Sequence, residues 1–334
     1  MAYEFPTVAT LCSHSALQIF HGARQENLGT LGVCTPERKT LYSSFPQASP
    51  DELVEVESFQ EILNEDLQTQ LNSENAILIP HGSFVEYVGA EKVMNSLSTP
   101  IFGNRDTLEW ESDRNKELRW LKKAEIQVPD EYSSPEEIED LAIVKFGGAK
   151  GGAGFFLAGS TEEFYEKIGD RSPEQATIQE WIAGTRYYPH YFYSPLDDRL
   201  EILGIDRRDE SNVDEYYRWE KGPKSFVVVG NKPLAVRESL LPKLHRMGRR
   251  LVEVSQKMFP PGLMGPFCLE TVCTDGLEFV TFEVSARIVA GTNLYPMGSP
   301  YSWYYYNEPM STGRRIAREI RQAVRRDLLD KITS

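Results

Sequence analysis

Three signals that assign proteins to broad classes are missing from this chain of 334 residues. No apolar run approaches the ~20 residues that a helix needs to cross a bilayer. The first residues also lack the basic and apolar regions of a signal peptide. The cysteines form no CxxC pair and have no histidine at zinc spacing. We therefore expect a cytoplasmic protein with no membrane partner and with buried free thiols at Cys12, Cys34, Cys268 and Cys273.

Positive charge is scarce as well, with 36 Lys and Arg against 50 Asp and Glu and a net charge of −14. A general nucleic-acid binder carries a basic face, so this balance argues against one. The arginine-rich segment 312–332 has acidic residues interleaved with its arginines. Its apolar residues recur at helical spacing, which favours a helix docked on the protein with a solvated face. They are Ile316, Ile320, Val324 and Leu328.

The composition is that of a globular protein, with 40% hydrophobic and 26% charged residues. Residues 1–103 alternate short apolar runs, at 8–12 and 76–80, with amphipathic stretches. This rhythm predicts a doubly wound α/β domain with a mostly parallel sheet. The remaining chain mixes helices with antiparallel strands, and we expect two α+β lobes, over 104–205 and 206–334.

Local signals place further elements within these units. The capping boxes Ser58-x-x-Glu61 and Ser160-x-x-Glu163 each open a predicted helix, and the first of these runs to Leu71. Helices are also predicted at 86–96, 112–124, 240–258 and 312–332, and strands at 141–145, 155–158, 177–182, 190–193, 200–205 and 226–229.

The strongest local signal is a hairpin in the C-terminal third, where Asp275-Gly276 is a preferred two-residue turn between two strands. With that turn, Glu270 faces Thr281, and Glu283 becomes a diagonal neighbour of Glu270 on the same face. Such neighbours are roughly 7–8 Å apart at the backbone, so both carboxylates would reach one ion.

The second strand of this hairpin is predicted to have one polar and one apolar face. Glu283 and Arg287 share the polar face, and Glu278 falls on the face away from both metal-ligand candidates. The apolar face holds Val280, Phe282, Val284, Ala286 and Ile288. Two carboxylates suit Mg²⁺ or Mn²⁺ shared with substrate phosphates, and Arg287 would steady a transferring phosphoryl group. A half-exposed hairpin with an ordinary polar face fits the pattern equally well.

A glycine-rich loop at 147–154 lies between two predicted strands. Its glycines let backbone N–H groups approach phosphate oxygens, and Lys145 and Lys150 add positive charge. The loop leads into a strand, so it is neither a Walker A loop nor a Rossmann fingerprint. A mobile hairpin would have the same composition. Downstream, the backbone around Trp181 and Ile182 could bind an adenine edge, although both residues also suit a core.

Two polar loops follow predicted strands of the N-terminal domain. Ser13-His14-Ser15 precedes a helix, whose N-terminus favours phosphate. His81-Gly82-Ser83 follows a second strand in the same way. In an open α/β sheet both loops would line the crevice beyond the strand ends, which makes a phosphorylated small molecule a plausible ligand. Helix caps and exposed histidines are the alternative interpretation.

The order of these features resembles the ATP-grasp superfamily, and a set of longer blocks resembles one family within it. The blocks are Ser13-His-Ser-Ala-Leu-Gln-Ile, His81-Gly-Ser-Phe-Val, Trp110-Glu-Ser-Asp-Arg-Asn, Tyr188-Pro-His-Tyr-Phe-Tyr-Ser, Ile205-Asp-Arg-Arg-x-Glu-Ser-Asn-Val-Asp, Val229-Gly-Asn, Arg237-Glu-Ser-Leu-Leu, Gly265-Pro-Phe-Cys-Leu-Glu and Glu283-Val-Ser-Ala-Arg-Ile-Val-Ala-Gly-Thr-Asn. That family is the archaeal-type formate-dependent FAICAR synthetase of purine biosynthesis. The resemblance runs nearly end to end.

The resemblance implies an ATP-grasp fold with an N-terminal pre-ATP-grasp domain. It also implies a ligase that joins formate to AICAR (5-aminoimidazole-4-carboxamide ribonucleotide) through formyl phosphate, with ATP as co-substrate and Mg²⁺ or Mn²⁺. A homo-oligomer is expected on the same ground. The implied site residues are His14, Ser83 and Asn231 for AICAR, Lys145, Lys150, Gly151, Gly152, Glu180, Trp181, Ile182 and Glu210 for ATP, Glu270 and Glu283 for the metal, and Arg287 for catalysis.

The chain departs from the family pattern in its glycine loop, where Gly147 and Ala153 replace a histidine and a lysine. The segment 211–230 is also shorter than in the family. Two alternatives therefore accompany the FAICAR synthetase interpretation. One is a paralogous ligase that joins another carboxylate to another amine, and the other is a non-catalytic nucleotide-binding regulator. Retention of Glu270 and Glu283 argues against the regulator.

Overall fold

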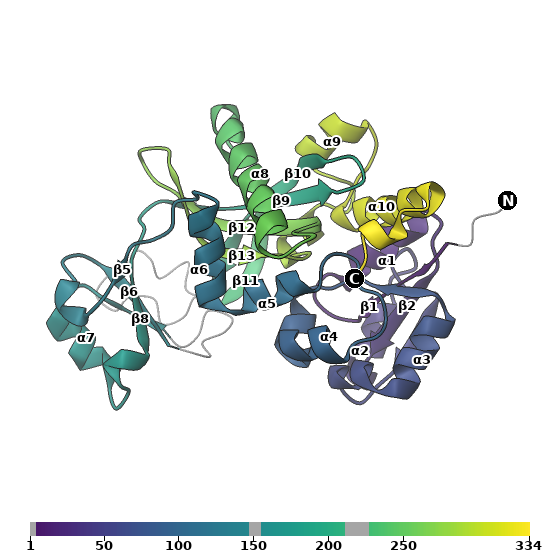
Figure 1. Cartoon of the computed structure of the whole chain (residues 1–334), viewed down its shortest axis with the longest axis horizontal. Helices are drawn as coiled ribbons and strands as arrows, with labels where there is room; N and C mark the ends of the chain where they lie inside the picture. Colours follow the sequence, from purple (N-terminus) through teal and green to yellow (C-terminus); the bar gives the residue numbers. More distant parts are fainter. Residues whose placement is uncertain (1–4, 147–154, 211–226) are drawn as a thin grey trace.

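The computed structural model describes residues 5–146, 155–210 and 227–334. The chain forms an N-terminal domain, a small lobe and a large sheet that lies between them (Figure 1). The predicted phosphate loop, with Gly147, Lys150, Gly151, Gly152 and Ala153, lies outside the described residues. The short segment 211–226 does so too.

The N-terminal domain is built on a four-stranded sheet of order β3-β2-β1-β4. All of its strand pairs are parallel, which confirms the predicted doubly wound arrangement. Its strands are β1 (Thr7–Leu11), β2 (Thr30–Cys34), β3 (Glu52–Glu55) and β4 (Ala76–Leu78). Its helices are α1 (Ala16–Gln25), α2 (Pro36–Ser43), η1 (Phe59–Leu63), α3 (Glu65–Ser73), η2 (Phe84–Val88) and α4 (Ala90–Ser96). All four cysteines of the chain are free and buried, as expected.

Two predicted helices are each broken once, so those predictions were wrong in continuity, whereas the helix predicted at 112–124 is present as one continuous helix. The Ser58 capping box is present, but it opens the short η1, because Asn64 is extended before α3 begins. Gly89, with φ +97°, separates η2 from α4, a conformation that glycine adopts without steric cost. Asp113 separates α5 (Asp106–Ser112) from α6 (Arg114–Lys123), and its carboxylate accepts the first backbone N–H groups of α6.

The small lobe carries an antiparallel sheet of order β5-β8-β6-β7. Ser160 caps α7 (Thr161–Ile168) through the Glu163 backbone N–H, as the capping box predicts. The sheet and α7 enclose their own apolar cluster around Phe164 and Ile178. The strands are β5 (Glu131–Tyr132), β6 (Ala142–Phe146), β7 (Phe155–Ala158) and β8 (Ala176–Glu180), with short helices η3 (Pro135–Glu137) and η4 (Pro173–Gln175).

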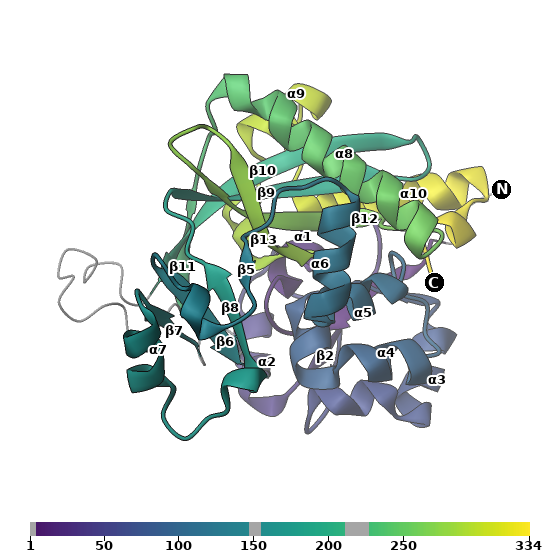
Figure 2. The same ribbon diagram turned by 60° about the vertical axis from the view of Figure 1, so that its left-hand side comes forward.

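A five-stranded sheet of order β11-β10-β9-β12-β13 forms the centre of the molecule (Figure 2). Its strands are β9 (Thr185–Ser194), β10 (Arg199–Glu210), β11 (Val228–Pro233), β12 (Gly265–Cys273) and β13 (Phe279–Ser285). One face packs on α6 and α8 (Leu241–Met258), with Trp120 and Leu251 in the shared core. The opposite face is polar. The division at 103 and 205 stays a prediction, and β10 runs across its second boundary.

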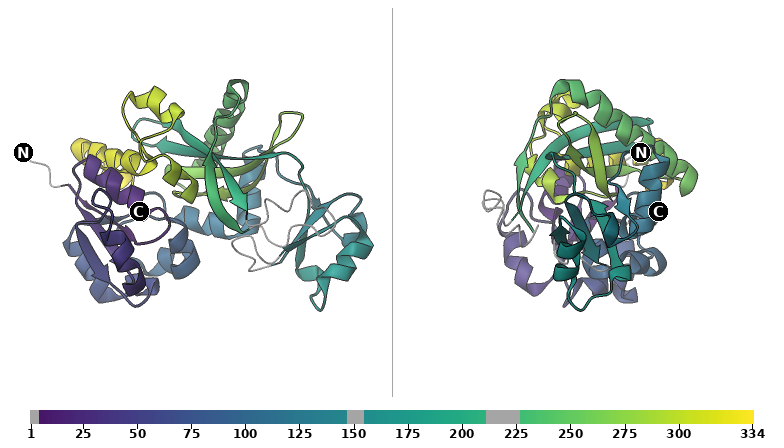
Figure 3. Two further views of the ribbon diagram at one scale, coloured as in Figure 1. Left: turned by 180° about the vertical axis from the view of Figure 1, so that it is seen from behind. Right: turned by 90° about the vertical axis from the view of Figure 1, so that its left-hand side faces the viewer.

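The C-terminal segment returns to the N-terminal domain, where α10 (Thr312–Arg326) packs along α1 (Figure 3, left). A Cβ atom on Gly22 would lie 2.1 Å from the Arg314 backbone nitrogen, so the two helices approach at backbone contact. Arg314, Arg318 and Arg321 all bind the buried Glu26 carboxylate. The predicted docking of this helix is confirmed, but these arginines take part in it, whereas the prediction had placed them on a solvated face.

The predicted extent of this last helix was wrong. It ends at Asp327, whose φ of +54° terminates it before the short η8 (Leu329–Lys331). The other C-terminal elements are η6 (Glu238–Leu240), η7 (Ala290–Leu294) and α9 (Pro300–Tyr306). Among the helices of the described ranges, none has the length and apolar character required to cross a membrane.

A buried ion network fixes α10 to the central sheet. The Arg315 guanidinium lies 3.1 Å from Glu201 and 2.7 Å from Glu319, and all three side chains are inaccessible to solvent. We expect Arg315→Met to lower the free energy of unfolding by about 3–5 kcal/mol, because it leaves buried carboxylates uncompensated. Urea denaturation would measure this loss. Arg325→Met, on the exposed face of the same helix, should change stability by less than about 0.5 kcal/mol, and equal losses would contradict the assignment.

Candidate active site

The β12–β13 hairpin brings Glu270 and Glu283 closer in register than predicted. The loop contains a third residue, Leu277 with φ +59°, and the Thr274 N–H donates to the Glu278 carbonyl across it at 2.9 Å. A bulge next to Glu270 shifts the register again. As a result Glu270 lies directly opposite Glu283, and the predicted pairing with Thr281 was wrong. Directly opposed residues share a face, so the carboxylates meet more closely than a diagonal pair would.

The same bulge corrects the predicted apolar face of β13. Val284 and Ala286 enter the core beneath the sheet, as predicted. Phe282 instead joins Tyr188 and Cys268 on the polar side, with its ring centroid 6.5 Å from that of Tyr188. A β-bulge places two consecutive residues against one, which breaks strict alternation.

The polar face of the central sheet gathers charged side chains from its adjacent strands. The Arg208 guanidinium donates two hydrogen bonds of 2.7 Å to the Glu270 carboxylate. On the same face Arg186 pairs with Glu210. Strand pairing places Asn231 opposite Arg208, so the predicted site residue Asn231 also lies on the polar face. Here each described arginine has an acidic partner.

A hydrogen-bonded triad of the buried His190 and Asp206 and the half-buried Asn231 lies beside these ion pairs. The His190 Nε2 atom lies 2.7 Å from one Asp206 oxygen, and the Asn231 amide donates to the other at 2.7 Å. A Cβ on Gly291 would fall 2.2 Å from the Asp206 carboxylate, so η7 covers the triad closely. The Asn231 amide nitrogen is thereby directed inward, which leaves its carbonyl oxygen to face away from Asp206.

The two polar loops of the N-terminal domain meet, as their positions after β1 and β4 predict. The His14 and His81 rings stack with centroids 5.4 Å apart. His81 Nε2 donates to the Leu11 carbonyl at 2.9 Å, and its Nδ1 accepts the Ser83 backbone N–H at 3.2 Å. Burial lowers the pKa of His81 to about 4, so its ring is neutral. A bridge from His81 to Ile288 brings both loops to the end of β13.

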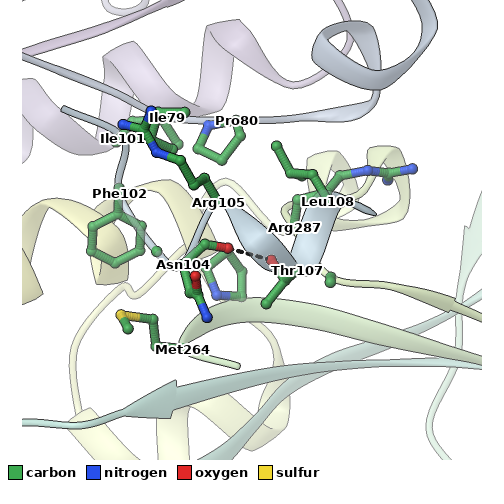
Figure 4. Close-up of a pocket in the computed structure, with 13 residues that line it drawn as sticks. Ile79, Pro80, Ile101, Phe102, Asn104, Arg105, Thr107, Leu108, Met264 and Arg287 are labelled. Atoms are coloured by element: carbon green, nitrogen blue, oxygen red, sulfur yellow. Dashed lines mark hydrogen bonds between the residues drawn. The ribbon is translucent and has the colours of Figure 1, made fainter. Parts of the chain in front are cut away.

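Arg287 lies at this junction and pairs with Glu111 of α5 at 2.8 Å. Its Nε atom is buried and lacks a hydrogen-bond partner among the described residues. A Cβ on Gly82 would lie 3.0 Å from His14 Nε2 and 3.7 Å from the Arg287 guanidinium carbon, so the loop and the arginine are close neighbours. Arg287, Pro80 and Leu108 are among the residues that line a cavity of about 10 Å³, which has room for roughly one water. Figure 4 shows these lining residues. The candidate site is therefore the open sheet face, not this enclosed space.

Two functional carboxylates were missed from the sequence. Since β13 is an edge strand, its outer N–H groups need partners. Glu111 accepts the Ala286 N–H at 2.8 Å, and Glu117 accepts the Val284 N–H. Glu117 precedes Trp120 by one helical turn on the buried face of α6. This spacing was the feature of the sequence that could have indicated a buried carboxylate.

The ATP candidates of the small lobe lie at its sheet and at its connection to the large sheet. Lys145 donates to the Gln179 side chain at 2.8 Å. Burial lowers the pKa of Lys145 and Arg114 lowers it further, whereas Glu283 and Glu117 oppose this. The predicted strand through Ile182 extended two residues too far, because β8 ends at Glu180. The Trp181 N–H is already bound to the Leu141 carbonyl at 2.9 Å.

Comparisons with known proteins identify the family. A curated "5-formaminoimidazole-4-carboxamide-1-(beta)-D-ribofuranosyl 5'-monophosphate synthetase" of Korarchaeum cryptofilum is 50% identical over 97% of this chain and 94% of its own length. The chain belongs to the FAICAR synthetase family. Two family profiles also match, one described as a protein of unknown function over residues 8–132 and one as a domain of unknown function over residues 160–334.

Solved structures support this membership and show the fold. An "IMP biosynthesis protein PurP" from Thermococcus kodakaraensis is 35% identical, with a TM-score of 0.80 over 98% of this chain and 100% of its own. An ADP complex of an N5-carboxyaminoimidazole ribonucleotide synthetase is 13% identical, with a TM-score of 0.67 over 95% of this chain and 78% of its own. This FAICAR synthetase family member therefore has the ATP-grasp fold predicted from its motifs.

The carboxylate pair of this family member fits a divalent cation. Among the described residues, no three His, Cys, Asp or Glu side chains form a complete protein cage. Mg²⁺ usually needs only one or two carboxylates, because substrate phosphates and water supply its other ligands. The surrounding protein and the Glu270 charge raise the pKa of Glu283 to about 7, and Arg208 and Arg287 oppose this. Without a cation the two carboxylates repel each other, and a bound metal would relieve this repulsion.

This pKa predicts how metal binding depends on pH. Glu283 carries its proton below about pH 7, and a metal ligand must be deprotonated, so binding releases that proton. We expect Mn²⁺ affinity, measured by the electron paramagnetic resonance of free Mn²⁺, to rise between about pH 5.5 and 7.5 and then to level off. The Glu283→Gln variant should bind more weakly and lose this rise. Equal wild-type affinity at both ends of the range would contradict the assignment.

Proposed function

We propose that this chain is an ATP-dependent ligase that converts AICAR and formate to FAICAR, with release of ADP and phosphate. The proposal rests on one observation above all: Glu270 and Glu283 oppose each other on a charged sheet face, in a chain 50% identical to named FAICAR synthetases. The open face between the small lobe and the N-terminal loops offers phosphate-binding groups on one side and neutral histidines on the other.

The reaction takes place in two transfers. A formate oxygen attacks the γ-phosphorus of ATP, and the bond to the ADP oxygen breaks, which gives formyl phosphate and ADP. The 5-amino nitrogen of AICAR then attacks the formyl carbon, phosphate leaves with the carbon–oxygen bond pair, and the nitrogen loses a proton. The protein contributes positioning and charge neutralisation without a covalent enzyme intermediate. Mg²⁺ or Mn²⁺, held by Glu270 and Glu283, would offset phosphate charge.

AICAR would bind at the N-terminal loops. His14 is exposed, although neighbouring protein atoms, His81 and the two arginines Arg287 and Arg208 lower its pKa well below the ordinary value. A neutral His14 ring can donate or accept a hydrogen bond without adding charge. Ser83 and Asn231 complete the proposed AICAR set, and Arg287 would steady the phosphoryl group with its unpartnered Nε.

ATP would bind between the small lobe and the central sheet. Lys145 would contact its phosphates, and Glu180, Trp181 and Ile182 would contact its adenine. Glu210 would also contact ATP. The small-molecule partners, the cytoplasmic location and a homo-oligomer belong to the same proposal. Exposed Trp303 and Tyr304 on α9 support an oligomer, because clustered exposed aromatics are typical of interfaces.

A second candidate is a paralogous ligase with another carboxylate and another amine. Gly147 and Ala153, which replace the histidine and lysine of the family pattern, favour it. The chemistry of the carboxylate pair would be unchanged. A regulator without catalysis has no observation in its favour, since Glu270, Glu283 and Arg287 are all retained.

The proposed reaction predicts ADP release that requires formate, AICAR and Mg²⁺ or Mn²⁺ together. Glu283→Gln should lower this rate by about a hundredfold or more, because one metal-binding charge is lost at the transferring phosphate. Glu278→Gln provides a matched control, since Glu278 belongs to the same hairpin but is exposed and pairs with Lys243. A coupled assay for ADP would measure both. ADP release with another amine but not with AICAR would favour the paralogue, and full activity of Glu283→Gln would exclude the metal role.

The AICAR position is tested by a second substitution. His14→Ala should raise the KM for AICAR about tenfold or more while the KM for ATP changes little, since the lost hydrogen bond belongs to one substrate. His21→Ala, on the half-buried side of α1, is the control. Steady-state kinetics with each substrate varied in turn would separate the effects. An equal rise in both KM values would contradict the placement.

A further inference from the structure

Arg208 binds the carboxylate of Glu270, which the proposed metal needs as a ligand. Its NH1 and NH2 groups bind separate oxygens of Glu270, both at 2.7 Å, and Ser285 donates to one of the same oxygens at 3.2 Å. This fork-to-fork contact uses the face of the carboxylate that a metal would approach in bidentate fashion. A divalent cation on Glu270 would also repel the guanidinium. Metal binding and the Arg208–Glu270 pair therefore compete.

A second contact holds Arg208 in place whether or not Glu270 is available. Its guanidinium carbon lies 3.9 Å from the centroid of the Tyr188 ring. Tyr188 is itself buried and meets Phe282 edge to face. Stacking on an aromatic ring fixes the plane of a guanidinium, so the loss of Glu270 would leave a pre-organised fork with exposed donors.

The surroundings of that fork suit a small carboxylate. Arg208 lies opposite Asn231, a proposed AICAR residue, and its partner Glu270 lies opposite Glu283, so Arg208 lies between the proposed AICAR site and the proposed metal site. The other arginines of this face differ in their partners. Arg186 pairs with Glu210 and Arg287 with Glu111, and neither of those carboxylates is a metal candidate. Of the arginines in the described part of the face, Arg208 is the one whose partner the metal would take.

We propose that Arg208 exchanges partners during the reaction: it neutralises Glu270 in the ligand-free enzyme, and it binds the carboxylate substrate and its acyl phosphate once a metal occupies Glu270. The substrate half of this inference rests on the proposed function. A planar carboxylate matches the two parallel N–H groups of the fork. With this exchange, formate would bind only after the metal, when Arg208 is released from Glu270. Formate would then be held next to the metal-bound phosphoryl group.

The first test concerns the metal alone and needs no turnover. Mn²⁺ binding is measured by electron paramagnetic resonance on the whole chain without nucleotide. Arg208→Met removes the competitor, and we expect Mn²⁺ to bind about threefold tighter or more, and to raise the melting temperature of the variant more than that of the wild type. Arg249→Met is the matched control. Arg249 also pairs with a carboxylate, Asp198, and its guanidinium carbon lies 5.9 Å from a tyrosine ring centroid. It belongs to α8, however, and not to the polar face of the sheet. Unchanged or weaker Mn²⁺ binding by Arg208→Met would overturn the competition.

The second test concerns the carboxylate substrate. Arg208→Lys keeps the positive charge but loses the two parallel N–H donors of the guanidinium. It can also be used for this test if Arg208→Met folds poorly. We expect the KM for formate to rise about ten- to a hundredfold, while the KM values for AICAR and ATP change by less than about threefold. Parallel changes in all three, or a fall in kcat alone, would overturn the formate role. A wild-type chain without formate-dependent ADP release would instead refute the proposed function, and the Mn²⁺ result would still decide the competition.

Discussion

The opposition of Glu270 and Glu283 across one hairpin is the constraint on which the rest of the site depends. Two carboxylates at directly opposed positions cannot both be charged without nearby compensation. The structure supplies that compensation from outside the hairpin, with Arg208 from β10 bound to Glu270 and Arg287 near Glu283. The polar face consequently holds carboxylates and arginines in close pairs.

The sequence predicted that Glu270 and Glu283 share one face of the hairpin, but it did not predict how the two residues pair. Alternation in β13 and a turn signal selected Glu270 and Glu283 over Glu278, and both lie on the site face. The register came out differently because the loop holds three residues and the strand carries a bulge. Neither has a strong local signature, since Leu277 is not a residue that favours positive φ. Tertiary contacts, not local preference, decided the register.

The same division between local and tertiary information holds for the fold. Parallel strands in the N-terminal domain followed from their apolar runs, and the Ser160 cap of α7 followed from its motif. Helix continuity failed at Asn64 and Gly89, where a single residue ends one helix and starts another. Glu111 and Glu117 escaped prediction for a different reason. Their role exists only because an edge strand from far along the chain lies beside them.

That edge contact also explains how the parts of the site are held together. The segment containing Glu111 and Glu117 leads directly into the small lobe, yet its carboxylates bind backbone N–H groups at Val284 and Ala286, just after Glu283. Glu117 is protonated more readily than an ordinary glutamate, because burial and the Glu283 charge raise its pKa well above the usual value. Lys145 of the small lobe lies within electrostatic range of both glutamates. One short helical segment therefore contacts the strand that would hold the metal and continues into the lobe that would hold the phosphates.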